Sequence, residues 1–200
     1  MIKVIGLTGG IGSGKSTISN YLKSKGLEII DCDEMSRNLT KKNGEALPDI
    51  RRAFGVSVFN DNGELDRKAL ANIVFNDKNE LNKLEKITTD IVVKKVEKIV
   101  NEAHNSATNG IVIIDAPLLF ECKVNELCDE TWLVTCNHET KIKRIILRDK
   151  TSIKEIEDRI KNQMSEAEKA KLADVIIDNS YDLQSLYNNL DKVLEAELDI

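Results

Sequence analysis

The apolar and polar positions along the chain alternate between short strand-sized runs and longer helical stretches. The short runs are rich in β-branched residues, and several of them end at an Asp or before a glycine-rich turn, which is typical of buried strands. They predict five strands, over Ile2–Leu7, Leu27–Ile30, Ile111–Ile114, Thr131–Thr135 and Val175–Ile177. Because helical stretches separate the runs, we expect an α/β fold class, with a five-stranded parallel sheet, right-handed crossovers and flanking helices.

The stretches between the strands place apolar residues at every third or fourth position, which indicates amphipathic helices. The first helix is expected over Lys15–Lys25, and it stops at Gly26, because glycine commonly ends helices. The segment from 33 to 109 contains no strand-like run, so it predicts an all-helical insert between the second and third strands. Within the insert we expect helices over Glu45–Phe54 and Asp66–Phe75, and one long helix from Leu81 to Ala103.

A second charged helical segment, Lys141–Lys171, lies between the predicted fourth and fifth strands. It is only weakly amphipathic and contains Arg144, Arg148 and Arg159. Helices that lie outside a sheet are candidates for parts that move during a reaction. We therefore divide the single domain of 200 residues into a core (1–32, 110–140 and 172–200), an insert (about 33–109) and a lid (about 141–171).

Composition excludes several classes of protein. Apolar residues make up 41% of the chain and charged residues 32%, as in ordinary soluble globular proteins. The 29 Lys and Arg against 34 Asp and Glu give a net charge of −5, and no basic patch stands out, so we expect no nucleic-acid partner. The longest apolar runs are strand-sized, so we expect no membrane span. No basic leader precedes the first strand, and no obligate protein partner is evident.

The cysteines favour reduced thiols over a metal site or a disulfide framework. None of them stands in C-x-x-C spacing, and His104 and His138 are distant from them in the sequence. We therefore expect a cytoplasmic protein. The four cysteines are Cys32, Cys122, Cys128 and Cys136.

A phosphate-binding loop follows the first predicted strand and opens the first predicted helix. Glycines allow backbone N–H groups to converge on a phosphate, and the helix adds its positive end. Lys15 can reach the β- and γ-phosphates, while the Ser16 hydroxyl can ligate Mg²⁺. A chance glycine-rich turn is the alternative, but the strand-loop-helix context is the one this motif requires. The match to G-x-x-x-x-G-K-[ST] is Gly9-Gly10-Ile11-Gly12-Ser13-Gly14-Lys15-Ser16.

Acidic residues end the second and third predicted strands, at the sheet edge where such folds bind ligands. Asp115 can hold Mg²⁺ or orient a substrate, or it can simply cap the next segment. Asp31 and Asp33 follow strand two, where a carboxylate can take the proton of an attacking hydroxyl. Asp33-Glu34 is equally a reasonable helix start. The lid arginines can stabilise γ-phosphate charge, although a solvated helix face explains them better from position alone.

The motif content narrows the class of phosphate-loop protein. A GTPase needs N-K-x-D, and the Asn82-Lys83 pair continues Leu84-Glu85. The L-S-G-G-Q of transporter ATPases is absent. An early phosphate loop followed by a helical insert fits a small-molecule kinase with a phosphoacceptor-binding insert and a closing lid.

Further blocks resemble the dephospho-CoA kinase family, from Leu7 almost to the C-terminus. Of these, the Asp-x-Pro-Leu-Leu-Phe-Glu block and the Ala-Asp-x-x-Ile-x-Asn block are the most specific in combination. The blocks are the phosphate loop with Thr17, Ile30-Asp31-Cys32-Asp33 with Arg37, Phe54-Gly55, Asp115-Ala116-Pro117-Leu118-Leu119-Phe120-Glu121, Arg148-Asp149, Arg159-Ile160 with Gln163, and Ala173-Asp174-Val175-Ile176-Ile177-Asp178-Asn179.

This resemblance implies a fold like the nucleoside monophosphate kinases and transfer of the ATP γ-phosphoryl group to the ribose 3′-hydroxyl of dephospho-CoA, the last step of coenzyme A biosynthesis. In that picture Asp33 is the base, Lys15 and the loop amides hold the phosphates, Ser16 holds Mg²⁺ and Arg148 reaches in from the lid. The ATP-binding set implied is Gly10, Ile11, Gly12, Ser13, Gly14, Lys15, Ser16, Thr17, Arg148 and Asn179, with Asn179 near the adenine. The acceptor-binding set implied is Asp33, Arg37, Asp115, Pro117, Leu118, Leu119 and Glu121.

One departure from the family pattern lies in the long middle helix. The family usually shows Leu-His-Pro there, whereas this chain reads Ile87-Thr88-Thr89-Asp90, so no histidine role carries over. Asp90 adds negative charge where a phosphate-bearing acceptor would pass. The alternatives are another small-acceptor kinase, of the nucleotide or shikimate type, and a nucleotide-binding regulatory protein.

Overall fold

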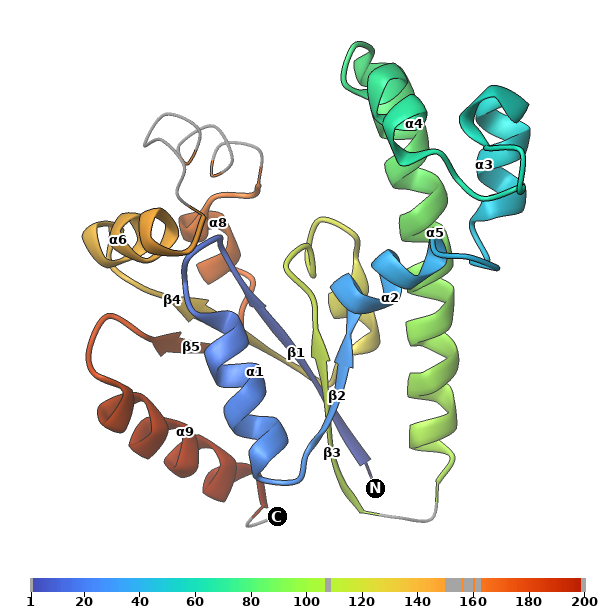
Figure 1. Cartoon of the computed structure of the whole chain (residues 1–200). Helices are drawn as coiled ribbons and strands as arrows, with labels where there is room; N and C mark the ends of the chain where they lie inside the picture. Colours follow the sequence, from blue (N-terminus) through green and yellow to red (C-terminus); the bar gives the residue numbers. More distant parts are fainter. Residues whose placement is uncertain (1, 107–108, 150–155, 157–159, 161–162, 199–200) are drawn as a thin grey trace. The chain divides into compact units, whose positions relative to one another are not determined.

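A computed structural model describes residues 2–106, 109–149, 156, 160 and 163–198 of the chain. Its centre is a five-stranded sheet in the order β2-β3-β1-β4-β5 (Figure 1). The pairs β1–β3, β1–β4 and β4–β5 are parallel, which confirms the predicted parallel sheet. The strands are β1 (Ile2–Gly9), β2 (Glu28–Asp31), β3 (Gly110–Asp115), β4 (Glu130–Thr135) and β5 (Val175–Asp178).

Two helices, α1 (Lys15–Ser24) and α9 (Leu183–Leu198), pack on the same face of the sheet (Figure 1). The burial of apolar side chains between these helices and the sheet is the main favourable contribution to folding. The sequence analysis assigned no helix to α9, although Leu186, Leu190 and Leu194 recur at i, i+4 spacing. The core they form contains Ile5, Leu7, Ile18, Leu22, Ile111, Ile113, Trp132, Val134, Ile177, Leu186, Leu190 and Leu194.

The predicted lid segment, 141–171, contains α8 (Glu166–Ala170) and most of α6 (His138–Asp149), which begins three residues before it. Ser165 and Glu168 form a capping box at the start of α8, which fixes where this short helix begins. Arg159, one of the candidate phosphate-binding arginines, lies outside the described residues. A short helix, η2 (Val124–Leu127), stands between β3 and β4.

The chain divides into two compact units, one of residues 1–30 and 103–200 and one of residues 31–102. We refer to them as the sheet unit and the helical unit. The helical unit begins at residue 31, where β2 ends, and runs to residue 102. It therefore ends seven residues before 109, the upper limit predicted for the insert. Its elements are α2 (Cys32–Leu39), α3 (Leu47–Phe54), η1 (Val56–Val58), α4 (Arg67–Val74) and most of α5 (Lys78–His104).

Local signals set the helix starts in the helical unit. Asp31 caps α2 by accepting a hydrogen bond from the Glu34 backbone N–H at 2.8 Å. Asp66 caps α4 in the same way, accepting from the backbone N–H groups of Lys68 and Ala69, both at 3.0 Å. Carboxylates at these positions satisfy orphan backbone donors and face the positive end of the helix. No helix among the described residues is long and apolar enough to cross a membrane.

Candidate active site

The phosphate loop joins the carboxyl end of β1 to the N-terminus of α1, as the sequence predicted. Gly12 and Gly14 have φ values of 77° and 89°, in the left-handed region that favours glycine. Gly14 is also the N-cap residue of α1, so the loop's last peptides stand at the positive end of this helix. That geometry is the one that binds phosphate through backbone N–H groups.

Close packing is a second reason why positions 12 and 14 require glycine. A Cβ on Gly12 would lie 2.8 Å from the Ile145 side chain and 2.9 Å from Lys141 Cγ, both on α6. A Cβ on Gly14 would lie 2.0 Å from Asn179 Nδ2. The loop therefore fits between α6 and the end of β5 only because these positions lack side chains.

Asn179 is hydrogen-bonded to the phosphate loop. Its side chain is buried, and its Nδ2 donates to the Ser13 carbonyl at 2.8 Å. Arg144 on α6 adds longer bonds of 3.4 Å to the same carbonyl and to Asn179 Oδ1. The Asn179 backbone N–H donates to the Thr135 carbonyl at 2.8 Å, which ties the end of β5 to the end of β4. The structure contains the contact between Asn179 and the loop. The adenine contact expected of Asn179 stays a prediction.

One polar atom in the loop has no partner among the described residues. Ser13 is buried, and its hydroxyl Oγ has no hydrogen bond. Buried hydroxyls without a partner are rare in proteins and cost free energy, so they often mark a site completed by a ligand or water. The orphan Ser13 hydroxyl and the N-terminus of α1 together fit a bound nucleotide phosphate.

Lys15 and Asp115 form an ion pair beside the loop. Lys15 Nζ donates to Asp115 Oδ1, and the two side chains are 15% and 6% exposed. The pairing follows from the sheet register, in which Asp115 stands opposite Leu7, two residues before the loop begins. After Asp115 the chain forms turns, and η2 begins only at Val124, so Asp115 caps no helix. The capping alternative for Asp115 is wrong, and its carboxylate serves the loop lysine.

The segment after β3 carries the predicted acceptor-side residues, and a buried lysine anchors it. Lys169 on α8 is 1% exposed, and its Nζ donates to the Pro117 carbonyl at 2.8 Å and lies 3.0 Å from Glu121 Oε1. The same Glu121 oxygen accepts from the Met164 backbone N–H at 3.1 Å. Leu119 is fully buried beside Gly6, whereas Leu118 is exposed. Glu121 thus links the segment after β3 to Met164 and to Lys169 of α8. Any substrate contact of residues 115–121 stays a prediction.

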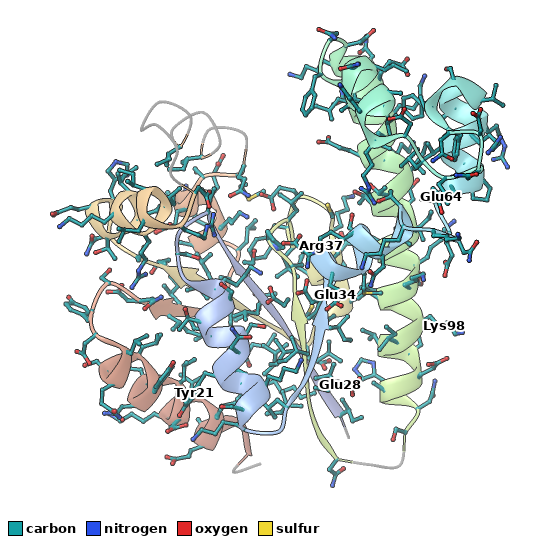
Figure 2. The ribbon with its side chains drawn as sticks, in the orientation of Figure 1. Tyr21, Glu28, Glu34, Arg37, Glu64 and Lys98 are labelled. Carbon is teal, nitrogen blue, oxygen red and sulfur yellow. The ribbon has the colours of Figure 1, made fainter. Side chains whose placement is uncertain are left out.

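Asp33 and Arg37 lie on α2 in the helical unit (Figure 2 labels Arg37). Asp31 is the N-cap residue, with φ −83° and ψ 102°, and Asp33 and Glu34 stand in the first turn of α2. The helix start expected at Asp33-Glu34 is therefore present, although Asp33 itself is not the cap. Asp33 stands in the exposed first turn. Arg37 is also exposed, and its Nη2 lies 3.9 Å from Asp31 Oδ2.

Comparisons with known proteins agree on one family. The family model described as dephospho-CoA kinase matches residues 3–185. The chain belongs to the dephospho-CoA kinase family. Among curated relatives, the dephospho-CoA kinase of Fusobacterium nucleatum is 38% identical and that of Carboxydothermus hydrogenoformans 39%, each over 98% of this chain and over 98% and 94% of the relative.

Solved structures support the dephospho-CoA kinase assignment and the P-loop kinase fold. The dephospho-CoA kinase of Campylobacter jejuni superposes with a TM-score of 0.69 at 28% identity, covering 98% of this chain and 96% of that one. The shikimate kinase of Acinetobacter baumannii reaches 0.53 at 14% identity, covering 99% and 96%, which shows a shared fold alone. The family assignment makes the chain an ATP-dependent kinase and favours dephospho-CoA over the nucleotide, shikimate and regulatory alternatives.

The lid arginines of this dephospho-CoA kinase family member differ in their surroundings. Arg148 is exposed at the end of α6 and forms two bonds with neighbouring Asp149, at 2.7 and 3.0 Å. Those bonds raise the pKa of Arg148 above its usual value, against a smaller opposing effect of burial. Arg144, by contrast, already contacts the phosphate loop.

Lys141, which the sequence did not single out, also lies beside the phosphate loop. Its side chain is largely buried on α6, its stem packs at Gly12, and its Nζ pairs with Glu166 Oε2 at 2.5 Å. Both charged atoms lie 4.0 Å from where a Cβ of Gly10 would stand. A lysine in a charged helical stretch gives no signal of this position, because the signal depends on how α6 packs against the loop.

Proposed function

We propose that this protein transfers the γ-phosphoryl group of ATP to the 3′-hydroxyl of the dephospho-CoA ribose, giving CoA and ADP. The observation that carries the proposal is the family match over residues 3–185, joined to a glycine-rich loop with left-handed φ values at Gly12 and Gly14. The 3′-oxygen forms the new bond to phosphorus, the bond to the bridging β,γ-oxygen breaks, and ADP leaves.

The sheet unit supplies the nucleotide side of this proposal. Loop N–H groups and Lys15 bind the β- and γ-phosphates, with Asn179 and Arg144 keeping the loop in shape. Phosphate oxygens replace Asp115 as the partner of Lys15 when ATP binds. Ser16 is exposed in the first turn of α1 and would hold Mg²⁺ together with the phosphates, which is how proteins usually bind this ion. When bound, Mg²⁺ neutralises charge on the transferring group.

The helical unit supplies the acceptor side. Asp33 accepts the proton that the 3′-hydroxyl loses as the new bond forms. Arg37, one helical turn further along α2, contacts acceptor phosphate. Arg148, on α6 of the sheet unit, stabilises charge on the γ-phosphate. Residues 117–121, in the sheet unit, are further acceptor-binding candidates in the same proposal. We place the enzyme in the cytoplasm, acting on a small molecule without nucleic acid, membrane or an obligate protein partner.

Mass spectrometry tests the activity directly. The purified protein is incubated with Mg-ATP and an equimolar mixture of dephospho-CoA, adenosine, AMP and shikimate. We expect dephospho-CoA alone to gain one phosphoryl group. Transfer to another acceptor would overturn the substrate but keep the kinase chemistry, and no transfer despite ATP binding would favour a regulatory protein.

A further inference from the structure

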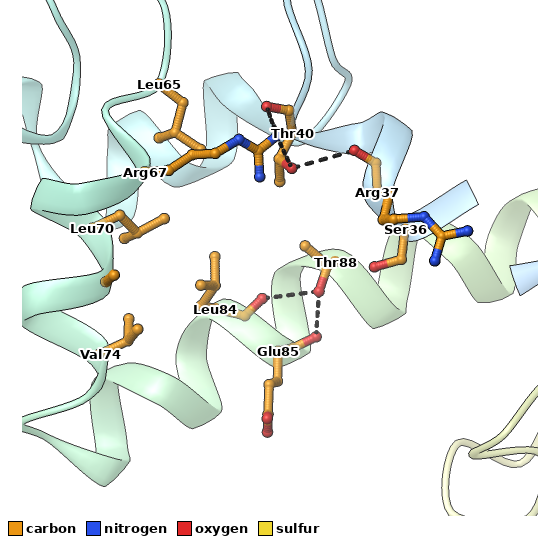
Figure 3. A pocket seen from close by; sticks show the side chains of 11 residues that line it. Ser36, Arg37, Thr40, Leu65, Arg67, Leu70, Val74, Leu84, Glu85 and Thr88 are labelled. Atoms are coloured by element: carbon orange, nitrogen blue, oxygen red, sulfur yellow. Dashed lines mark hydrogen bonds between the residues drawn. The ribbon is translucent and has the colours of Figure 1, made fainter. Parts of the chain in front are cut away.

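The helical unit contains a cavity of about 360 Å³ between α2, α4 and α5 (Figure 3). Sites for small organic ligands start at about this size. Part of the lining, the apolar wall, is formed by Leu70 and Val74 from α4 and by Leu84 from α5. The sequence analysis did not identify this cavity, because its walls come from three segments that are apart in the chain.

A second part of the lining, the polar wall, is polar and cationic. Arg67 and Thr40 lie there together: Arg67 Nη2 donates to the Thr40 carbonyl at 3.0 Å and to its hydroxyl at 3.1 Å. These bonds fix the guanidinium against the end of α2 (Figure 3). Because Arg67 is exposed and a guanidinium has five N–H donors, the group remains accessible to a ligand carbonyl or phosphate. Arg37 lines the same cavity as a second cation.

A line of polar residues leads along α2 to this cavity. Asp33, Arg37 and Thr40 stand at positions i, i+4 and i+7, so they fall along one face of the helix. At 1.5 Å per residue, Arg37 is about 6 Å and Thr40 about 10 Å beyond Asp33 along the axis. A ligand that offers a hydroxyl to Asp33 therefore meets a cation within one turn and the cavity within two.

The acceptor of the proposed reaction has groups in this same order. Its ribose bears the reacting hydroxyl, a diphosphate follows, and then comes the pantetheine arm, which carries methyl groups, a hydroxyl, two amides and a thiol. We propose that the cavity binds the pantetheine arm, with Arg37 at the diphosphate and Arg67 at an amide carbonyl. This inference rests on the proposed function. The methyl groups match the Leu70 wall, and the amides match the polar wall.

One acidic residue at the cavity sets the direction of the arm. Glu85 on α5 lines the cavity and is exposed. Its carboxylate repels a diphosphate but accepts a hydrogen bond from an amide N–H. The diphosphate therefore lies at the Arg37 end, and the amides lie towards Glu85.

A cavity-filling variant with a matched control tests the assignment. Ala71 lines the cavity, whereas Ala69, on the same helix and equally half-buried, does not. With ADP release as the assay, Ala71→Leu is expected to raise the KM for dephospho-CoA about tenfold or more, because it displaces the arm. The KM for ATP stays unchanged, and Ala69→Leu stays within about twofold of the wild type for both substrates.

A charge variant and a fragment give an independent readout. Arg67→Gln on the exposed rim should raise the same KM, and Lys68→Gln, which removes a neighbouring exposed charge, should not. The probe 4′-phosphopantetheine, which lacks the adenosine and one of the two phosphates, should compete with dephospho-CoA on the wild type and lose this competition on Ala71→Leu. An unchanged KM in well-folded Ala71→Leu and in Arg67→Gln, or no competition on the wild type, overturns the cavity assignment. If the wild type does not phosphorylate dephospho-CoA at all, the proposed function itself fails.

Discussion

Lys169 offers the sharpest test of how the segment after β3 is held. The substitution Lys169→Met keeps an unbranched side chain of similar length and removes the ammonium group. It thereby deletes the bond to the Pro117 carbonyl and the ion pair with Glu121. The Pro117 carbonyl loses its lysine donor, and among the described residues Glu121 keeps the Met164 backbone N–H as its donor.

The expected cost follows from burial. Removing one partner of a fully buried ion pair costs about 3–5 kcal/mol, because the remaining charge stays uncompensated. Glu121 is 22% exposed, so water screens part of its charge, and we expect a loss of about 2–3 kcal/mol. For a chain of this length each kcal/mol lowers Tm by about 2–4 °C, so the variant should melt roughly 4–12 °C below the wild type.

Thermal unfolding followed by circular dichroism at pH 7 measures this difference. Lys171→Met is the matched control, since Lys171 is an exposed lysine two residues further along, and it should melt close to the wild type. Glu121→Gln keeps an acceptor oxygen, so it should cost less than Lys169→Met. The reasoning is refuted if Lys169→Met melts within about 1 °C of the wild type.

Three further predictions concern the reaction and the thiols. Asp33→Asn should lower kcat by about 10²–10⁴ while the KM for ATP stays near normal, since a base acts in the transition state, and a wild-type kcat would remove Asp33 from the mechanism. Lys15→Ala should lower kcat/KM for ATP by about 10² or more in a steady-state assay, and an active variant would contradict the role of the loop lysine. Burial, aided by the negative charge of Asp129, raises the pKa of Cys128 to about 12. At pH 8 only about one Cys128 thiol in 10⁴ is therefore ionised. Iodoacetamide should label this thiol far more slowly in the folded protein than in the urea-unfolded protein, and peptide mass spectrometry measures both rates. Equal labelling rates would disprove this prediction.

Local chemistry determined much of this protein from its sequence. β-branched runs predicted the five strands, because a buried strand needs little beyond such a run and a stop. The phosphate loop was equally predictable from the sequence, since glycines with positive φ and a following helix are local requirements. The helix α9 was not predicted, although its leucines Leu186, Leu190 and Leu194 recur with helical spacing.

Tertiary structure decided which partners these residues take. Only the structure separates Asp31, which caps α2, from Asp33, because both residues are acceptable caps by type. Only the sheet register brings Asp115 to Lys15, 100 residues away in the sequence, and Asn179 to Ser13, 166 residues away. Glu121, expected to contact substrate, is held by a buried lysine. A residue's type and its neighbours along the chain fix which bonds it can form, whereas the packing of distant segments fixes which bonds it does form.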